Sequence, residues 1–96
     1  MKKISFSSTK AEELRNNPTR NRVSFEDCIL ALQEGRLLDD IPNPSPAFPH
    51  QRIFIFEFGG YAYAAPYVQD DDGIFLKTIY PSRLYNLIYL KDKDHE

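Results

Sequence analysis

The sequence has little of what cross-links, metal sites or membrane spans require. Cys28 is its single cysteine, so no disulfide can form within the chain, and the apolar helical pattern around it favours a buried thiol. His50 and His95 stand far apart without neighbouring ligands, so we expect neither a metal ion nor a cofactor. No segment approaches the ~20 apolar residues of a membrane helix, and residues 1–6 lack the apolar core of a secretory signal. We therefore expect a cytoplasmic protein.

The charge balance argues against a surface built wholly for nucleic acid, because the formal net charge is -2. The acids gather at Asp39-Asp40, at 70–72 and in the tail. Arg15, Arg20 and Arg22 lie close together with no acid between them, which leaves room for a local basic patch. At 96 residues, with 42% hydrophobic and 27% charged residues, the chain is expected to form one domain over residues 1–96.

The strongest β-formers lie in residues 51–80, which predicts three consecutive antiparallel strands. Residues 51–58 and 61–65 flank Gly59-Gly60, a pair that tolerates the positive φ of a tight hairpin. With a two-residue turn, one face of the hairpin is aromatic and the other aliphatic. Both faces are apolar, so helices must cover one, and either a partner or the C-terminal segment must cover the other.

Further strands flank this hairpin in the prediction. A turn at 70–73 leads into a strand over 74–80, which Pro81 ends because proline cannot donate to a ladder. Residues 36–41 predict an edge strand or an extended lead-in that pairs with the strand at Ile53. The prolines between 42 and 49 then form a semi-rigid connection, which either only spans a distance or binds a partner.

Three helices are expected. Ser8 or Thr9 caps a short first helix over 10–16, and Ser24 with Asp27 forms a capping box for a second that ends at Gly35. The stripe of the second helix, which should cover the sheet, consists of Phe25, Cys28, Ile29 and Leu32. Ser82 caps a last helix over 83–90, followed by a frayed tail over 91–96. Its apolar face consists of Leu84, Tyr85, Leu87, Ile88 and Tyr89. The fold class is α+β, with two N-terminal helices, an antiparallel meander of three to four strands and a short C-terminal helix.

The residues that remain for chemistry are arginine, lysine, tyrosine and histidine, since no nucleotide loop, zinc motif or nucleophile elbow is present. Metal-independent RNA cleavage is compatible with them, because the RNA's own 2′-hydroxyl is the nucleophile. Arg52 and Arg83 are expected near one sheet edge as a phosphate-binding pair, while Tyr80 or His50 assists proton transfer. The alternative assigns the arginines to surface ion pairs, Tyr80 to the core and His50 to solvent.

Three segments resemble the BrnT toxins of type II toxin-antitoxin systems. Residues 20–27, Arg-Asn-Arg-Val-Ser-Phe-Glu-Asp, are similar to the Lys-His-Gly-Val-x-Phe-Glu-Glu that leads into the family's second helix. Residues 6–12 resemble its opening Trp/Phe-Asp-x-x-Lys-Ala-Glu, and 79–83, Ile-Tyr-Pro-Ser-Arg, its Ile-Ile-Ser-Ala-Arg. The resemblance covers nearly the whole chain in order. The chain departs from it at Asn21-Arg22, in place of His-Gly, and in a last helix without basic residues.

The resemblance implies a RelE-like fold and a ribonuclease that a cognate antitoxin neutralises. Our first interpretation is accordingly a toxin that cleaves RNA through Arg52 and Arg83 and associates with an antitoxin or with further copies of itself. The alternative is a non-enzymatic protein–protein interaction module of the same fold, which the net acidity favours.

Overall fold

The computed structural model of the chain describes residues 3–17 and 23–90. Several sequence predictions lie outside these residues: the basic side chains of Arg20 and Arg22, the polar link around them, and the tail at 91–96.

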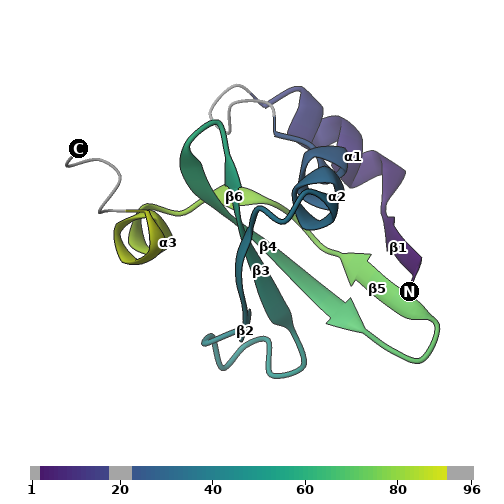
Figure 1. Cartoon of the computed structure of the whole chain (residues 1–96). Coiled ribbons are helices and arrows are strands. Elements are labelled where there is room, and N and C mark those ends of the chain that lie inside the picture. The colour runs from purple at the N-terminus through teal and green to yellow at the C-terminus, as the bar shows by residue number, and fades with distance from the viewer. Residues whose placement is uncertain (1–2, 18–22, 91–96) are drawn as a thin grey trace.

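The described residues form three helices and a mixed six-stranded sheet, which confirms the α+β class with two N-terminal helices and a short C-terminal helix (Figure 1). The elements in chain order are β1 (Lys3–Phe6), α1 (Ser8–Arg15), α2 (Phe25–Gln33), β2 (Leu37–Pro42), β3 (Arg52–Phe58), β4 (Tyr61–Gln69), β5 (Gly73–Leu76), β6 (Tyr80–Pro81) and α3 (Arg83–Tyr89). The strand order is β1-β5-β4-β3-β2, and β6 pairs with β4. No helix among the described residues is long and apolar enough to cross a bilayer.

The β3–β4 hairpin has the predicted register. Phe58 lies opposite Tyr61, Phe56 opposite Tyr63 and Phe54 opposite Ala65. Gly59 and Gly60 both adopt positive φ, at 61° and 81°, which a two-residue hairpin turn requires. The two faces separate as expected: the aromatic face joins the larger core, and the aliphatic face forms a smaller one around Ile53, Ile55, Ala62 and Ala64.

The prediction of a purely antiparallel meander is wrong, because β1 pairs with β5 in parallel and forms one edge of the sheet. Lys3 lies opposite Gly73, where a Cβ atom would come within 2.3 Å of the Lys3 carbonyl oxygen. The glycine at this position therefore permits the two backbones to approach. Ile4 and Phe6 of β1 pack against the larger core, and the Phe6 ring stacks on Phe25 with centroids 4.7 Å apart.

The strands after the hairpin also differ from the prediction. β4 continues to Gln69 rather than ending at Ala65, and the strand predicted over 74–80 divides into β5 and β6. Leu76 pairs with Tyr67 and Tyr80 with Ala64, so three residues, 77–79, lie opposite only two of β4. Pro66 is one of those two and has no N–H to donate, although its carbonyl accepts from the Lys77 N–H at 2.8 Å. The missing donor explains why the ladder bulges there.

The N-terminal helices cover the aromatic face of the sheet. The first helix begins at Ser8, two residues before the predicted start, because Ser7 is the N-cap and accepts from the Lys10 N–H. Ser24 and Asp27 form the predicted capping box of α2. Phe25 and Cys28 are fully buried and Ile29 and Leu32 partly buried in the larger core, as predicted for the stripe. Burial raises the pKa of the Cys28 thiol to about 12, so this side chain stays protonated.

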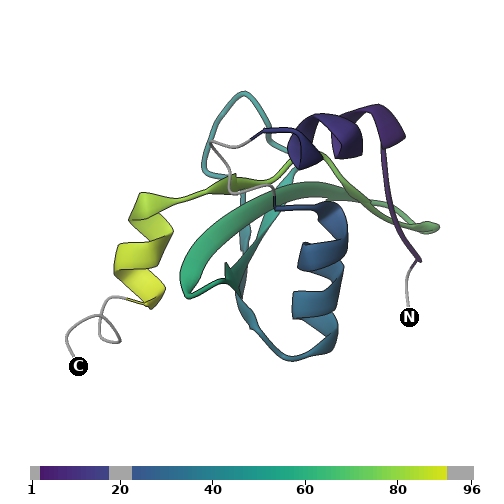
Figure 2. The same ribbon diagram turned by 90° about the horizontal axis from the view of Figure 1, so that it is seen from above.

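α3 covers the aliphatic face, so the C-terminal segment fills one of the two roles left open by the sequence. Figure 2 shows α2 and α3 on opposite sides of the curved β3–β4 hairpin. Ser82 caps α3 as predicted, while the buried Asn86 side chain accepts from the Ala62 N–H at 3.0 Å. The predicted apolar face is wrong in part: Tyr85 and Tyr89 pack on the sheet, but Leu84, Leu87 and Ile88 are exposed. Because Asn86 points inward, this apolar stripe points outward.

Candidate functional site

Arg52, the first residue of β3, is held by a carboxylate on the edge strand. Its Nε donates to Asp40 Oδ1 at 3.1 Å and its Nη2 donates to the Asp40 carbonyl oxygen at 2.8 Å. The hydroxyl of Tyr67 donates to the same Oδ1 at 2.7 Å. Burial and, secondarily, this bond raise the pKa of Tyr67 to about 12, so the phenol stays protonated at neutral pH. The Arg52 charge is thus already compensated within the chain.

Asp39 forms the corresponding contact on the other face of β2. It accepts a short hydrogen bond from the hydroxyl of Tyr89 in α3. This bond and the Asp40 N–H hold the pKa of Asp39 below its usual value, and the same bond raises the pKa of Tyr89 to about 12. The pair anchors the C-terminal helix to the edge strand and holds Tyr89 protonated.

Arg83 lies exposed at the first position of α3, and its side chain makes no hydrogen bond or ion pair with another described residue. Leu84, Leu87 and Ile88, which we call the α3 stripe, follow it on the helix and are 62%, 49% and 59% exposed. A free guanidinium therefore borders an uncovered apolar surface. Arginine in such a position can hold a phosphate or carboxylate through two parallel hydrogen bonds.

The expectation that Arg52 and Arg83 lie near the same edge is wrong. β3 and β6 each run antiparallel to β4, so they run in the same direction. Arg52 begins β3 and Arg83 follows the end of β6, so the two arginines lie toward different ends of β4. Arg52 pairs with Tyr67 and Pro81 with Tyr63, positions of β4 that differ by four (67 minus 63), or about 13 Å along the strand. In this arrangement the two arginines cannot both bind the same phosphate.

Tyr80 lies in a pocket of about 350 Å³ that we call the loop pocket. Its lining consists of Asn43, Ser45, Phe48, Gln51, Pro66, Lys77, Thr78 and Tyr80. His50 is exposed in the proline-rich loop and precedes the lining residue Gln51. The structure thus brings Tyr80 and the neighbour of His50 to one pocket, while Arg83 follows Tyr80 by three residues, within about 11 Å between Cα atoms.

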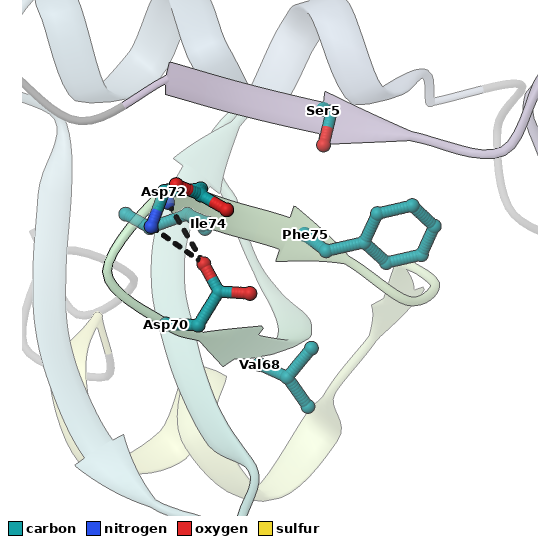
Figure 3. A pocket seen from close by; sticks show the side chains of 7 residues that line it. Ser5, Val68, Asp70, Asp72, Ile74 and Phe75 are labelled. Atoms are coloured by element: carbon teal, nitrogen blue, oxygen red, sulfur yellow. Dashed lines mark hydrogen bonds between the residues drawn. The ribbon is translucent and has the colours of Figure 1, made fainter.

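A second, smaller pocket of about 170 Å³ lies at the turn between β4 and β5 (Figure 3). There the Asp70 carboxylate points into the turn and accepts from the backbone N–H groups of Asp72 and Gly73, at 2.8 and 3.0 Å. These bonds give the acidic run a local role in turn formation. In the described ranges no group of histidine, cysteine and carboxylate side chains is arranged to hold a metal ion.

Sequence reasoning missed the tyrosine–aspartate contacts and most of the loop pocket. Alternation along a strand places Asp39 and Asp40 on opposite faces of the sheet, and this was the available signal for the two tyrosine–aspartate contacts. Phe48 and Lys77 carried no signal, because the pocket depends on where the proline-rich loop folds back. Scans of family models and searches of curated proteins and solved structures found no match to this chain.

Proposed function

We propose that this chain is the toxin of a type II toxin-antitoxin pair, a metal-independent endoribonuclease that acts in the cytoplasm and is neutralised by a cognate antitoxin. The observation that carries the proposal is Arg83, exposed without a side-chain partner among the described residues and bordered by the α3 stripe. From α1 onward, the order of two helices, antiparallel strands and a C-terminal helix is the order that the BrnT resemblance implies, while β1, which precedes the helices and pairs in parallel, is additional; we take the fold to be RelE-like.

The proposed reaction needs little covalent chemistry from the protein. The RNA 2′-hydroxyl gives up its proton and attacks the adjacent phosphorus, and Arg83 stabilises the negative charge that develops on the phosphate oxygens. The bond from phosphorus to the 5′-oxygen breaks, and this oxygen takes a proton, so the products are a 2′,3′-cyclic phosphate and a 5′-hydroxyl. Tyr80 and His50 are the proposed proton-transfer groups. Arg52 is reassigned to a structural role, because its guanidinium is bonded to Asp40 and lies at the other end of the strands.

The α3 stripe supports the antitoxin part of the proposal. Contiguous exposed apolar side chains mark protein-binding surfaces more often than scattered ones. A partner that covers Leu84, Leu87 and Ile88 also covers the neighbouring Arg83, so a single contact surface accounts for both binding and neutralisation.

The second candidate is a non-enzymatic interaction module of the same fold. It is favoured by the separation of the two arginines and by the net charge of -2. Inducible expression of the chain, alone and together with the product of the adjacent reading frame, distinguishes the two. The toxin proposal expects growth arrest that co-expression relieves and cleavage of RNA by the purified chain in the presence of EDTA. A chain that neither arrests growth nor cleaves RNA belongs to the second class.

A further inference from the structure

We propose that the loop pocket binds one unstacked nucleobase of single-stranded RNA; this inference rests on the proposed function and names how its substrate is held. Its volume of about 350 Å³ lies in the range of small-molecule sites. Phe48 and Tyr80 contribute aromatic rings, and Lys77 contributes a cation. In a chain of net charge -2, none of the eight lining residues is acidic.

The proline-rich loop holds its wall of the pocket in place before any ligand binds. The Asn43 N–H donates to the Gln51 carbonyl at 2.9 Å and closes the loop at its base. Within it, the Ser45 N–H donates to Asn43 Oδ1 at 2.9 Å, and the Phe48 N–H donates to the Ser45 carbonyl at 3.1 Å. Prolines restrict the rest of the loop. An aromatic ring on a loop with this many internal bonds loses little conformational entropy when a ligand stacks on it.

Phe48 is the exposed element of this wall, at 48% of its surface. A large apolar ring held out of both cores contributes little to folding. Aromatic rings presented in this way are what single-stranded nucleic acids use as stacking platforms.

The opposite wall follows from Pro66. Because this residue lacks an N–H, residues 77–79 bulge from the ladder, and both Pro66 and the bulged Lys77 line the pocket. Bulges next to functional sites commonly redirect a side chain. Here the bulge brings Lys77 to the pocket wall, with its ammonium over the Phe75 ring, 5.4 Å from the ring centroid, and a turn of this long side chain away from Phe75 would let the ammonium meet a phosphate that follows a bound base.

The polar groups suit a base better than an apolar side chain. The Gln51 amide oxygen accepts from Asn43 Nδ2 at 3.3 Å, while its amide nitrogen has no partner among the described residues. A donor beside aromatic rings matches the ring nitrogens and carbonyl oxygens of a nucleobase, and the adjacent ammonium matches its phosphate. An apolar peptide side chain would use neither group.

The test measures the binding of fluorescein-labelled, 2′-O-methyl-substituted single-stranded RNA by fluorescence anisotropy. The substitution blocks the 2′-oxygen nucleophile, so that binding is measured without cleavage. Phe48→Ala is expected to weaken binding about 5- to 100-fold. Lys77→Ala is expected to weaken it and to lower the salt dependence by about one phosphate contact. The control is Leu30→Ala, which removes an apolar side chain of similar exposure, 45%, on α2. This variant should bind RNA like the wild-type protein. Thermal melting of each variant verifies folding.

The outcomes separate this inference from the proposed function. RNA binding that depends on Phe48 in a chain that cleaves no RNA supports the pocket and overturns the enzyme proposal. Cleavage with an unchanged Kd and KM in Phe48→Ala supports the enzyme and overturns the pocket. The inference is also overturned if the unchanged chain binds no RNA, or if Phe48→Ala weakens the antitoxin complex and leaves RNA binding intact.

Discussion

Asp39 and Asp40 are consecutive residues of β2, yet each holds a tyrosine on a different face of the sheet. Asp40 accepts from Tyr67 and Asp39 from Tyr89. Neighbouring strand residues point to opposite faces, so one dipeptide connects the edge strand both to the larger core and to α3. The Asp40–Tyr67 contact responds to alkaline pH through Tyr67, whereas the Asp39–Tyr89 contact responds to acid through Asp39 as well as to alkali through Tyr89.

Tyr67→Phe should make the free energy of unfolding fall less steeply as the pH rises into the alkaline range. In the folded chain, burial and then the Asp40 bond raise the pKa of Tyr67 from 10.0 to about 12. The folded state therefore favours the protonated phenol, and this contribution is full below pH 10 and is lost as the pH rises through 12. We expect Tyr67→Phe to unfold about 1 to 3 kcal/mol more easily at pH 7. Urea unfolding of both proteins at neutral and alkaline pH checks this, and curves that remain parallel across the pH range would contradict it.

Tyr89→Phe should change the stability on the acid side, through Asp39, in addition to the alkaline side where Tyr89 itself titrates. The Tyr89 hydroxyl and the Asp40 N–H hold the pKa of Asp39 below 3.8. This contribution is present above pH 3.8 and is lost as the pH falls through the lower folded-state pKa. The variant should lose less stability on acidification and exchange its α3 amide hydrogens faster at neutral pH. Tyr85→Phe, which removes a hydroxyl with no partner among the described residues, is the control, and equal exchange in both variants would refute the anchor.

Phe56→Ala tests the assignment of the main core. Phe56 is fully buried on the aromatic face, in contact with Tyr63 at a centroid distance of 5.9 Å. Its removal leaves a cavity, and we expect a loss of about 3 to 5 kcal/mol in the free energy of unfolding. Leu30→Ala on the exposed side of α2 should change it by less than about 0.5 kcal/mol. A denaturation midpoint that is the same for Phe56→Ala and the unchanged chain would be incompatible with this packing.

Arg83→Ala should slow RNA cleavage about 10²- to 10³-fold while the melting temperature stays nearly unchanged, since the side chain has no partner to lose among the described residues. Arg83→Lys should restore cleavage only in part, because lysine cannot form two parallel bonds to a phosphate. Single-turnover cleavage of the three proteins measures the effect. If Arg83→Ala cleaves as fast as the unchanged chain, the ribonuclease class survives and this site assignment does not.

Leu87→Glu should prevent co-purification with the antitoxin, because it places a charge in the centre of the α3 stripe. Leu87 is already exposed, so folding should change by less than about 0.5 kcal/mol. The matched control is Leu30→Glu, a similarly exposed leucine on another helix, which should leave the complex intact. If the Leu87→Glu variant still forms the complex, the antitoxin binds a surface other than the α3 stripe.

The elements that could be predicted are those whose signals are local. Gly59 and Gly60 set the hairpin register directly, and Ser24 with Asp27 sets the start of α2 within one turn of chain. The parallel pairing of β1 could not be predicted, because its signal is divided between Lys3 and the distant Gly73.

For the candidate site, the exposed start of α3 followed from the Ser82 cap, whereas the Arg52–Asp40 ion pair did not follow from any local pattern. These two residues are joined by the long proline-rich loop, whose ends set no strand register by themselves, unlike a two-residue turn. The outward direction of Leu87 was missed for a different reason. The buried Asn86 bonds to the backbone of β4, and so rotates the helix away from the orientation that hydrophobicity alone favours.

The parallel edge of the sheet also imposes an order of events during synthesis. β1 leaves the ribosome before the other described strands, but its hydrogen-bonding partner β5 emerges only after the hairpin and the proline-rich loop. Closing so long a loop comes late in folding, so β1 stays unpaired on the nascent chain while the β3–β4 hairpin is able to form locally. We therefore expect β1, the first of the described strands, to be among the last to join the sheet.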